Sequence, residues 1–394
     1  MSALKYWVWL AELQGLGNQA RLALLRHFGG PEELFYADPE ELLLVEGVTR
    51  CETAVLANHD LRPADQILAA CQEENIRIMT LQDGDYPGRL QNIYDPPIVL
   101  YVKGRLPLLD EELAVAVVGT RAYSPYGQLA AEKLGYGLAK GGAVVISGLA
   151  KGIDALAAWS ARRAGGTVVG VVGNGLDVFY PRSSRFLYED LAATGAIVSE
   201  YPPGTEPAGR HFPQRNRILS GLAAATLVIE APEKSGALIT ANLALEQGRD
   251  LYAVPGPIDA PNSVGCNQLI REGAGLVAEP WDLLMDYTER YPGKLKSEDS
   301  WIRTEVLDEP PETMEIPSPA LPEFDLKHND LHLTDDQITI LRAIPQEPIQ
   351  VDDLIELTGI PTRRVLSAMT ILELENLVCQ SSGKHYALTV RLTE

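Results

Sequence analysis

Short apolar runs alternate with longer amphipathic stretches through the middle of the chain. The runs are apolar at nearly every position rather than at every second one, which is typical of strands buried on both faces of a parallel sheet. Most runs are followed by glycine and then by a helical pattern. The predicted strands are Ala114–Val118, Ala143–Ser147, Thr167–Val172, Ala196–Ser199, Thr226–Glu230, Asp250–Val254 and Leu276–Ala278. This pattern predicts an α/β fold built on a doubly wound, Rossmann-like parallel sheet.

Two more short strands are predicted upstream, at Ile76–Thr80 and Ile98–Val102. The residues between them are rich in Asp, Gly and Pro, which is the composition of turns. We therefore expect this region to extend the α/β domain, so that an extended Rossmann-like domain covers about residues 61–290.

Residues 1–60 predict an N-terminal all-α domain. Glycine-centred turns at Gly15–Gly17 and Gly47 each precede a helical stretch, Gln19–His27 and Cys51–Ala57. This arrangement is similar to a duplicated helix–hairpin–helix, or a SAM-like, unit. In one interpretation the backbone N–H groups of the turns face a phosphate, and in the other the glycines only end helices that pack together. The scarcity of Lys and Arg around the second turn favours packing.

An acidic, proline-containing linker is predicted at residues 291–332. Between residues 297 and 330 ten acidic side chains stand against Arg303 and Lys327. The pattern after the linker resembles a winged helix at residues 333–394. Its predicted helices are Asp335–Ala343, Val351–Thr358 and Pro361–Glu375, and its predicted wing strands are Leu377–Gln380 and His385–Thr389.

Composition narrows the class of protein. The chain has 394 residues, of which 46% are hydrophobic, enough for several buried cores. No apolar run is long enough to cross a membrane, and the first ten residues lack the features of a signal peptide. Four widely spaced cysteines with no C-x-x-C fit a cytoplasmic location. The net charge of −21 argues against a surface coated for nucleic acid, although it does not exclude a local basic groove.

The candidate binding residues follow the predicted strands. Carboxyl ends of parallel strands meet at one rim of a sheet, so the loops that follow them lie together. Glycine lets a backbone approach an anion, and helix N-termini supply N–H groups and partial positive charge. The candidates are Gly119, Thr120, Arg121, Ser147, Gly148, Lys151, Gly152, Phe212, Arg215, Asn216, Arg217, Lys234, Ser235 and Gly236. Together they predict a cationic groove for phosphate groups.

The same loops exclude several chemistries. None carries the dinucleotide-binding G-x-G-x-x-G or the P-loop pattern, so NAD and ATP are disfavoured and no cofactor is predicted. No metal-ligand spacing and no nucleophile elbow occurs, so we predict no metal and no catalytic residue. Ser124 and Asp154 are predicted helix N-caps. Phe212 is either a platform on which a base stacks or part of the core.

The loop sequences resemble those of the DprA/Smf family of DNA-processing proteins. The matching blocks occur in the family's order: Val118–Arg121, Ser147–Asp154, Gly175–Pro181, Phe212–Ile218, Ser235–Ala241, Gly248–Asp250 and Val254–Gly256. The chain departs from the family at Asn174, where a cysteine is common, and at Ser183–Ser184, where an acid and an asparagine are common.

The resemblance implies a cytoplasmic single-stranded-DNA-binding protein without catalysis of its own. It would protect incoming strands during natural transformation and load the RecA recombinase onto them, acting as a homodimer. The DNA-contacting G-[ST]-R loop of the family falls on Gly119–Arg121. The resemblance also places Lys151–Gly152, Arg215–Arg217 and Ser235–Gly236 along the path of the strand.

Two alternatives stay open. The domain is also similar to nucleotide phosphoribohydrolases of the lysine-decarboxylase-like group, but Ser235–Asn242 lacks the catalytic Glu of their P-G-G-x-G-T-x-x-E loop. In the winged helix, Arg363 and Arg364 are candidates for contacting duplex DNA. The acids Glu373 and Glu375 favour contact with a protein instead. No membrane partner is predicted.

Overall fold

The computed structural model describes residues 3–181, 184–297, 323–325, 333–344, 349–374, 377–381 and 385–393. Contacts divide the chain into two units, Met1–Glu309 and Pro310–Glu394. Most of the predicted linker, together with Ser183 and Glu375, lies outside the described residues.

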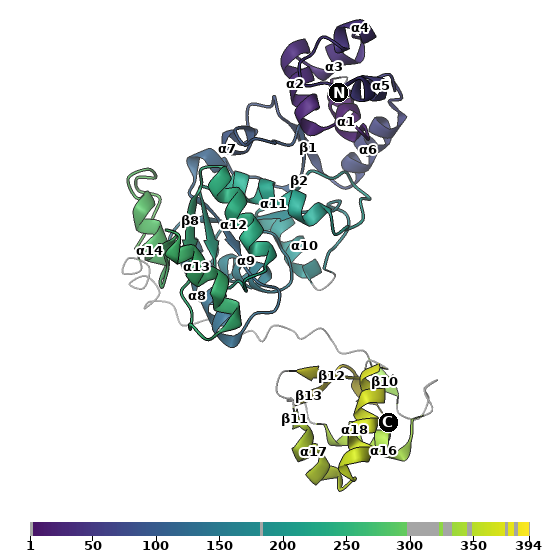
Figure 1. Ribbon diagram of the computed structural model, residues 1–394, viewed down its shortest axis with the longest axis vertical. Helices are drawn as coiled ribbons and strands as arrows, with labels where there is room; N and C mark the ends of the chain where they lie inside the picture. The colour runs from purple at the N-terminus through teal and green to yellow at the C-terminus, as the bar shows by residue number, and fades with distance from the viewer. Residues whose placement is uncertain are drawn as a thin grey trace. The chain divides into compact units, whose positions relative to one another are not determined.

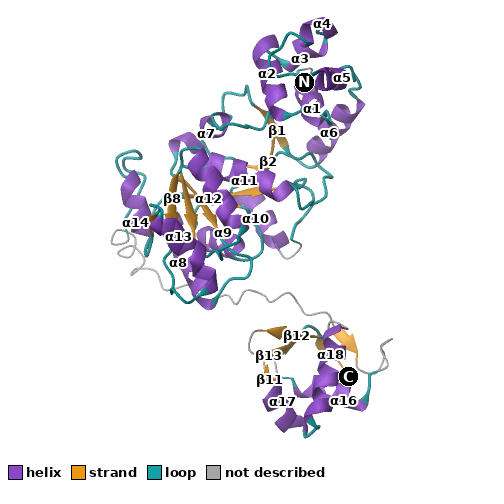
Figure 2. Ribbon diagram, viewed as in Figure 1, coloured by secondary structure: helices purple, strands orange, loops and turns teal. Residues whose placement is uncertain are grey.

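A nine-stranded sheet forms the centre of the first unit (Figures 1 and 2). Its strands are β1 (Arg77–Thr80), β2 (Val99–Gly104), β3 (Ala114–Val118), β4 (Val144–Ser147), β5 (Val168–Val172), β6 (Ala196–Ser199), β7 (Ala225–Val228), β8 (Asp250–Ala253) and β9 (Gly275–Leu276). Their order is β1-β2-β6-β5-β4-β3-β7-β8-β9. β2 is antiparallel to both of its neighbours, and the other pairs are parallel. The predicted doubly wound sheet is confirmed, and the two upstream strands extend one edge of it.

Helices cover both faces of this sheet. Side chains of β3 alternate between the two cores, with Val115 and Val117 in one and Ala116 and Val118 in the other. The first core takes side chains from α8 (Pro125–Lys140), α9 (Ile153–Arg163), α10 (Arg185–Thr194) and α14 (Pro280–Leu284). The second takes side chains from α7 (Gly88–Gln91), α11 (His211–Leu222), α12 (Gly236–Glu246) and α13 (Val264–Arg271). Short 3₁₀ turns occur at Leu109–Glu111, Pro261–Ser263 and Met285–Tyr287. Burial on both faces is the physical reason why the strands read as continuous apolar runs.

The N-terminal helices share the first of these cores. They are α1 (Leu4–Glu12), α2 (Asn18–Phe28), α3 (Pro31–Phe35), α4 (Pro39–Leu42), α5 (Arg50–Leu56) and α6 (Arg62–Glu73). Trp7 and Leu10 of α1 belong to the same buried cluster as Tyr101 of β2. The helical region therefore packs on the sheet through a continuous apolar contact.

An internal carboxylate occupies the space between the two glycine-centred turns. Glu52 accepts hydrogen bonds from the backbone N–H groups of Gly17 (3.2 Å) and Thr49 (2.9 Å). Hydrogen bonds from Thr49, first through its backbone and then through its side chain, lower the pKa of Glu52 below its ordinary value. The N–H groups of Gly17 and Thr49 thus have an anionic partner within the protein, which favours the packing interpretation of this region.

The second unit contains a winged helix. Its helices are α16 (Asp335–Ala343), α17 (Val351–Thr358) and α18 (Thr362–Leu374). The sheet β11-β13-β12 is formed by Ile349–Gln350, His385–Leu388 and Val378–Ser381. β10 (Glu323–Asp325) pairs in parallel with β14 (Arg391–Thr393), a pairing that the sequence pattern did not indicate.

One of the two arginines that were candidates for contacting duplex DNA is already paired within this unit. Both Arg364 nitrogens that face Asp336 of α16 donate to its carboxylate at 2.7 Å. This two-pronged contact links α18 to α16 and gives the Arg364 charge a partner within the protein. Arg363 is exposed.

Candidate nucleic-acid interface

The strand order creates a switch point between β3 and β7. From β3 the chain crosses to β4, β5 and β6 on one side, and then returns to β7 on the other side of β3. Loops that leave the two strands on either side of such a point diverge and leave a crevice, where ligands bind in doubly wound folds. A cavity of about 650 Å³ lies here, lined by residues 118–121 after β3 and by 232 and 234–237 after β7. We call it the switch-point groove.

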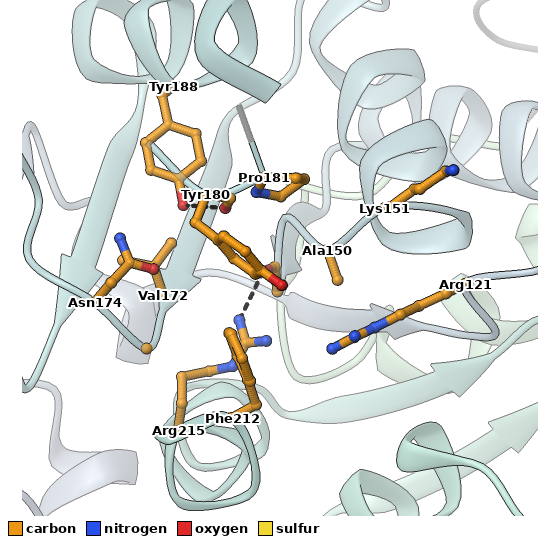
Figure 3. A pocket seen from close by; sticks show the side chains of 12 residues that line it. Arg121, Ala150, Lys151, Val172, Asn174, Tyr180, Pro181, Tyr188, Phe212 and Arg215 are labelled. Carbon is orange, nitrogen blue, oxygen red and sulfur yellow. Dashed lines mark hydrogen bonds between the residues drawn. The ribbon is translucent and has the colours of Figure 1, made fainter. Parts of the chain in front are cut away.

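Aromatic and cationic side chains meet in this groove. The rings of Tyr180 and Phe212 stack with centroids 5.4 Å apart, and the guanidinium carbon of Arg121 lies 5.6 Å from the Phe212 centroid. Figure 3 shows Arg121 reaching toward these rings, whereas Lys151 points away from them. A smaller pocket of about 50 Å³ adjoins the groove beneath Tyr180 and shares Arg121, Phe212 and Arg215 with it.

Three cations at the groove keep their charge free. Arg121, Lys151 and Lys234 are exposed, and within the described part of the chain none of them makes an ion pair with an acidic side chain. Because a paired arginine or lysine has little charge left to offer, these unpaired side chains are the ones suited to phosphate.

The helix N-termini at this rim are capped in different ways. The buried carboxylate of Glu230 accepts from Ser124 N (2.9 Å) and Ser124 Oγ (2.6 Å) at the start of α8. Ser124 is the N-cap, as predicted, but the anion at this helix end is Glu230. At α9 the N-cap is Gly152, so the predicted cap at Asp154 is wrong. At α12, Ser235 caps the helix, Gly236 is exposed, and both line the groove.

Asp154 and Arg215 are buried charged residues that lie close together under the groove. Asp154 is 7% exposed and Arg215 is 5% exposed. Asp154 Oδ1 accepts from Gly119 N at 3.2 Å. Arg215 Nη1 donates to Gly148 O at 2.7 Å and also to Val171 O. Arg215 thus lines both cavities while its hydrogen bonds go to backbone carbonyls, so it acts on the groove chiefly through its charge.

Burial perturbs both members of this pair. Loss of solvent raises the pKa of Asp154 to about 6, although Arg215 and the N–H groups of Gly119 and Gly148 oppose the shift. Burial likewise lowers the pKa of Arg215.

The structure gathers most of the predicted residues at one place. Those that line the switch-point groove are Gly119, Thr120, Arg121, Phe212, Arg215, Asn216, Lys234, Ser235 and Gly236. Gly148 and Lys151 line the smaller pocket. Ser147, Gly152 and Arg217 line neither cavity.

Two of these three residues hold the loops together. Ser147 is fully buried, and its hydroxyl donates to Asp154 O at 2.8 Å. Gly152 has φ of +102°, and a Cβ there would lie 2.5 Å from Thr120 O. Only glycine allows the second loop to approach the first this closely.

Arg217 faces the opposite side of α11. Its guanidinium pairs with Glu200 (2.6 Å) and Asp95 (3.2 Å). It lines a separate cavity of about 710 Å³ that also borders the N-terminal helices. Its neighbours there include both acids and arginines, so this cavity is not a purely cationic surface.

Replacing Arg217 with alanine is therefore expected to affect stability. The change leaves two partly buried carboxylates without their counter-charge, which costs about 1–3 kcal/mol of unfolding free energy after allowance for their partial exposure. Denaturant unfolding measures this loss, and a nucleic-acid titration should show an unchanged salt dependence. Normal stability with weakened binding would instead place Arg217 in the binding path.

Because the pKa of Asp154 is raised, the free energy of unfolding should increase as the pH falls. Its pKa is about 6 in the folded protein and about 3.9 in an unfolded chain. The folded state therefore holds the proton more tightly, and protonation adds stability as the pH falls from 7 through 6. Relative to Asp154→Asn, the wild type should gain about 1 kcal/mol of unfolding free energy between about pH 7.5 and pH 5. Denaturant unfolding of both proteins tests this, and a constant difference would contradict the raised pKa.

Tyr180 and Asn174 were not among the predicted binding candidates, although both line the smaller pocket. Tyr180 stacks on Phe212, and its place in the block Gly175–Pro181, close to predicted cations, was an available signal. Asn174 is buried and donates to Gly175 O (3.0 Å) and Val178 O (2.7 Å). This asparagine thus fixes the loop that leads to Tyr180.

The described residues hold neither a metal-binding cluster nor a helix able to span a membrane. No group of three or more His, Cys, Asp or Glu side chains there is arranged to hold a metal ion. None of the helices in that part of the chain has both the length and the hydropathy needed to cross a membrane.

Known proteins match both units. The family model for DNA recombination-mediator protein A matches residues 77–288, and the model for the DprA winged helix domain matches residues 325–384. Protein Smf of Synechocystis sp. is 35% identical over 97% of this chain and 98% of its own length. DNA processing protein DprA of Streptococcus pneumoniae is 37% identical over 73% of this chain and 99% of its own length.

A solved structure agrees with these matches. The X-ray structure of DprA from Streptococcus pneumoniae superposes with a TM-score of 0.63 at 37% identity, covering 72% of this chain and 97% of that one. The loops of the switch-point groove fall within the matched residues. On the family models, the full-length similarity to Smf and the shared fold, the chain belongs to the DNA recombination-mediator protein A (DprA/Smf) family.

Proposed function

We propose that the chain binds single-stranded DNA in the switch-point groove. One observation carries the proposal: the stacked rings of Tyr180 and Phe212 lie beside the guanidinium of Arg121, which forms no ion pair among the described residues. A single strand presents both a base face and a phosphate at each nucleotide. Aromatic side chains stack on the base, and cationic side chains pair with the phosphate.

The arrangement suits the backbone of the strand. Arg121 offers a planar fork to phosphate oxygens, and Lys234 and Lys151 add charge along the rim. The open N-terminus of α12 at Ser235 and Gly236 offers backbone N–H groups. None of these contacts reads a base edge, so we expect binding that depends strongly on salt and weakly on sequence.

We further propose the biological role that the family description suggests. The strand would be protected during natural transformation and passed to the RecA recombinase in the cytoplasm, with the protein acting as a homodimer. Two grooves on one dimer would hold a strand more tightly than one groove, through effective concentration. The description of the family as a recombination mediator supports this role.

We propose no catalysis at this site. Asp154 is the carboxylate that lines the groove among the described residues, and it is buried and hydrogen-bonded to the Gly119 backbone. The loop at Ser235–Asn242 offers no glutamate in the place where the phosphoribohydrolases carry theirs. For the winged helix we propose a protein contact, because Arg364 is already paired with Asp336.

A binding experiment tests the central proposal. Fluorescence anisotropy of labelled oligo(dT) and of a duplex of the same length should show preferential retention of the single strand by the full chain. The logarithm of its affinity should fall by about 0.7 per neutralised phosphate with the logarithm of salt concentration. In a second experiment, nucleoside monophosphates are incubated with the protein, and chromatography detects any free base released. Release of free base without single-strand binding would support the hydrolase and overturn the proposal.

A further inference from the structure

The buried acid Asp154 lies directly under the groove, between the loops that form it. It accepts a hydrogen bond from Gly119 N, at the foot of the loop that carries Arg121. Across Gly148 it faces Arg215, since a Cβ at Gly148 would lie 2.5 Å from Asp154 Oδ2 and 2.7 Å from Arg215 Nη1 and Nη2. Asp154 lines the same cavity that we propose for DNA.

The groups around Asp154 make it sensitive to charge in the groove. Arg215 comes from α11 and Arg121 from the loop after β3, and both favour its ionised form. Tyr188 of α10 faces Arg215 from the other side and is itself raised in pKa by burial, to about 12, so it stays neutral. Lys151 precedes α9 and is exposed.

Two further titratable groups lie at this rim. Glu230, at the end of β7, is held by Ser124 and by the start of α8. His211 of α11 stacks on Tyr201 with centroids 4.1 Å apart, and its Nδ1 donates to Gly173 O at 3.0 Å. His211 is therefore the group that an experiment has to separate from Asp154.

We propose that Asp154 couples the binding of single-stranded DNA to the uptake of a proton, so that the groove holds DNA more tightly as the pH falls from about 8 to 6. The inference rests on the proposed function. A phosphate entering the groove brings negative charge toward a buried carboxylate and competes with it for Arg215 and Arg121. Protonation of Asp154 removes that repulsion and releases the full charge of Arg215 to the phosphate.

The free protein is poised for this coupling. Burial already raises the pKa of Asp154 to about 6, and nearby phosphate raises it further. Coupling between two ligands is reciprocal, so if DNA favours the protonated acid, the protonated acid favours DNA. The affinity should therefore rise by about 3- to 10-fold between about pH 8 and pH 6. Uptake of one proton sets an upper limit of about tenfold per pH unit.

The test compares the wild type with Asp154→Asn. Oligo(dT) is the probe, because the charge of its bases and phosphodiesters does not change across this pH range. At constant salt, the wild-type affinity should rise by about 3- to 10-fold between about pH 8 and pH 6. The affinity of Asp154→Asn should lack this rise. The matched control is His211→Gln, which should keep the wild-type slope.

A second measurement detects the bound proton directly. Calorimetry of the wild type with oligo(dT) near pH 7, in two non-phosphate buffers of different ionisation enthalpy, reports protons taken up on binding. Net uptake that Asp154→Asn lacks supports the proposal. Tight binding with no uptake, or with a profile unchanged in Asp154→Asn, overturns it and leaves the groove intact as the DNA site. No binding of oligo(dT) at any pH would instead overturn the proposed function.

Discussion

Replacing Arg121 with alanine is expected to weaken binding of single-stranded DNA by about 10- to 100-fold. The side chain is exposed, is not ion-paired with an acid in the described structure, and stands over the Phe212 ring. A charge-assisted contact to phosphate is worth about 1.5–3 kcal/mol, which corresponds to that loss. The slope of log affinity against log salt should also become shallower by about 0.7, because one fewer phosphate is neutralised.

Arg105→Ala is the matched control for this experiment. Arg105 is also exposed, but it follows β2, whose last residue Gly104 pairs with Ala196 at the start of β6. It therefore lies at the amino-terminal edge of the parallel strands, opposite the switch-point groove. Both variants lose one positive charge, so a general charge effect would weaken them equally. An equal loss in the two variants, or none in Arg121→Ala, would remove Arg121 from the interface.

Replacing Phe212 with alanine is expected to cost about 5- to 150-fold in affinity without changing the salt slope. Stacking of one base on an aromatic ring is worth about 1–3 kcal/mol and involves no counterion. Phe212 is half-buried, stacks on Tyr180 and lines both cavities, so its ring is fixed before DNA arrives. Anisotropy titrations with oligo(dT) at several salt concentrations separate the two effects.

The controls for Phe212 address its second possible role in the core. Phe212→Tyr keeps the ring and should retain affinity, while Phe186→Ala removes a 77% exposed aromatic that lines neither cavity. Unfolding measurements on Phe212→Ala show how much packing is lost. A large loss of stability with unchanged affinity for DNA would assign the ring to the core alone.

The strands could be predicted because burial on two faces leaves a direct trace in the sequence. β3 and β6 match their predicted ranges, and the other parallel strands differ from theirs by one or two residues at one or both ends. The N-cap Ser124 of α8 could likewise be predicted, since an N-cap has local requirements. The pairing of β10 with β14 could not, because it joins short segments far apart in the chain.

Asp154 shows where local interpretation fails. An aspartate at the start of a helix is most simply a cap, and the sequence offers no other partner for it. In the structure the cap is Gly152, and Asp154 is carried inward by α9 to meet Gly119 and the charge of Arg215. Its raised pKa depends on burial by segments more than 30 residues away in either direction, which no local pattern encodes.

The sequence by itself determined the doubly wound sheet and the loops that gather at its carboxyl edge, because both follow from hydrophobic periodicity and from turn chemistry along the chain. Only the tertiary structure decided which side chains of those loops face the groove. Arg215 and Arg217 are two positions apart on α11, and at 3.6 residues per turn they project to nearly opposite sides of the helix. One faces the Asp154 side of the groove and the other pairs with Glu200 and Asp95. The packing of α11 against the sheet determines which of the two arginines faces the groove, and no single segment specifies that packing.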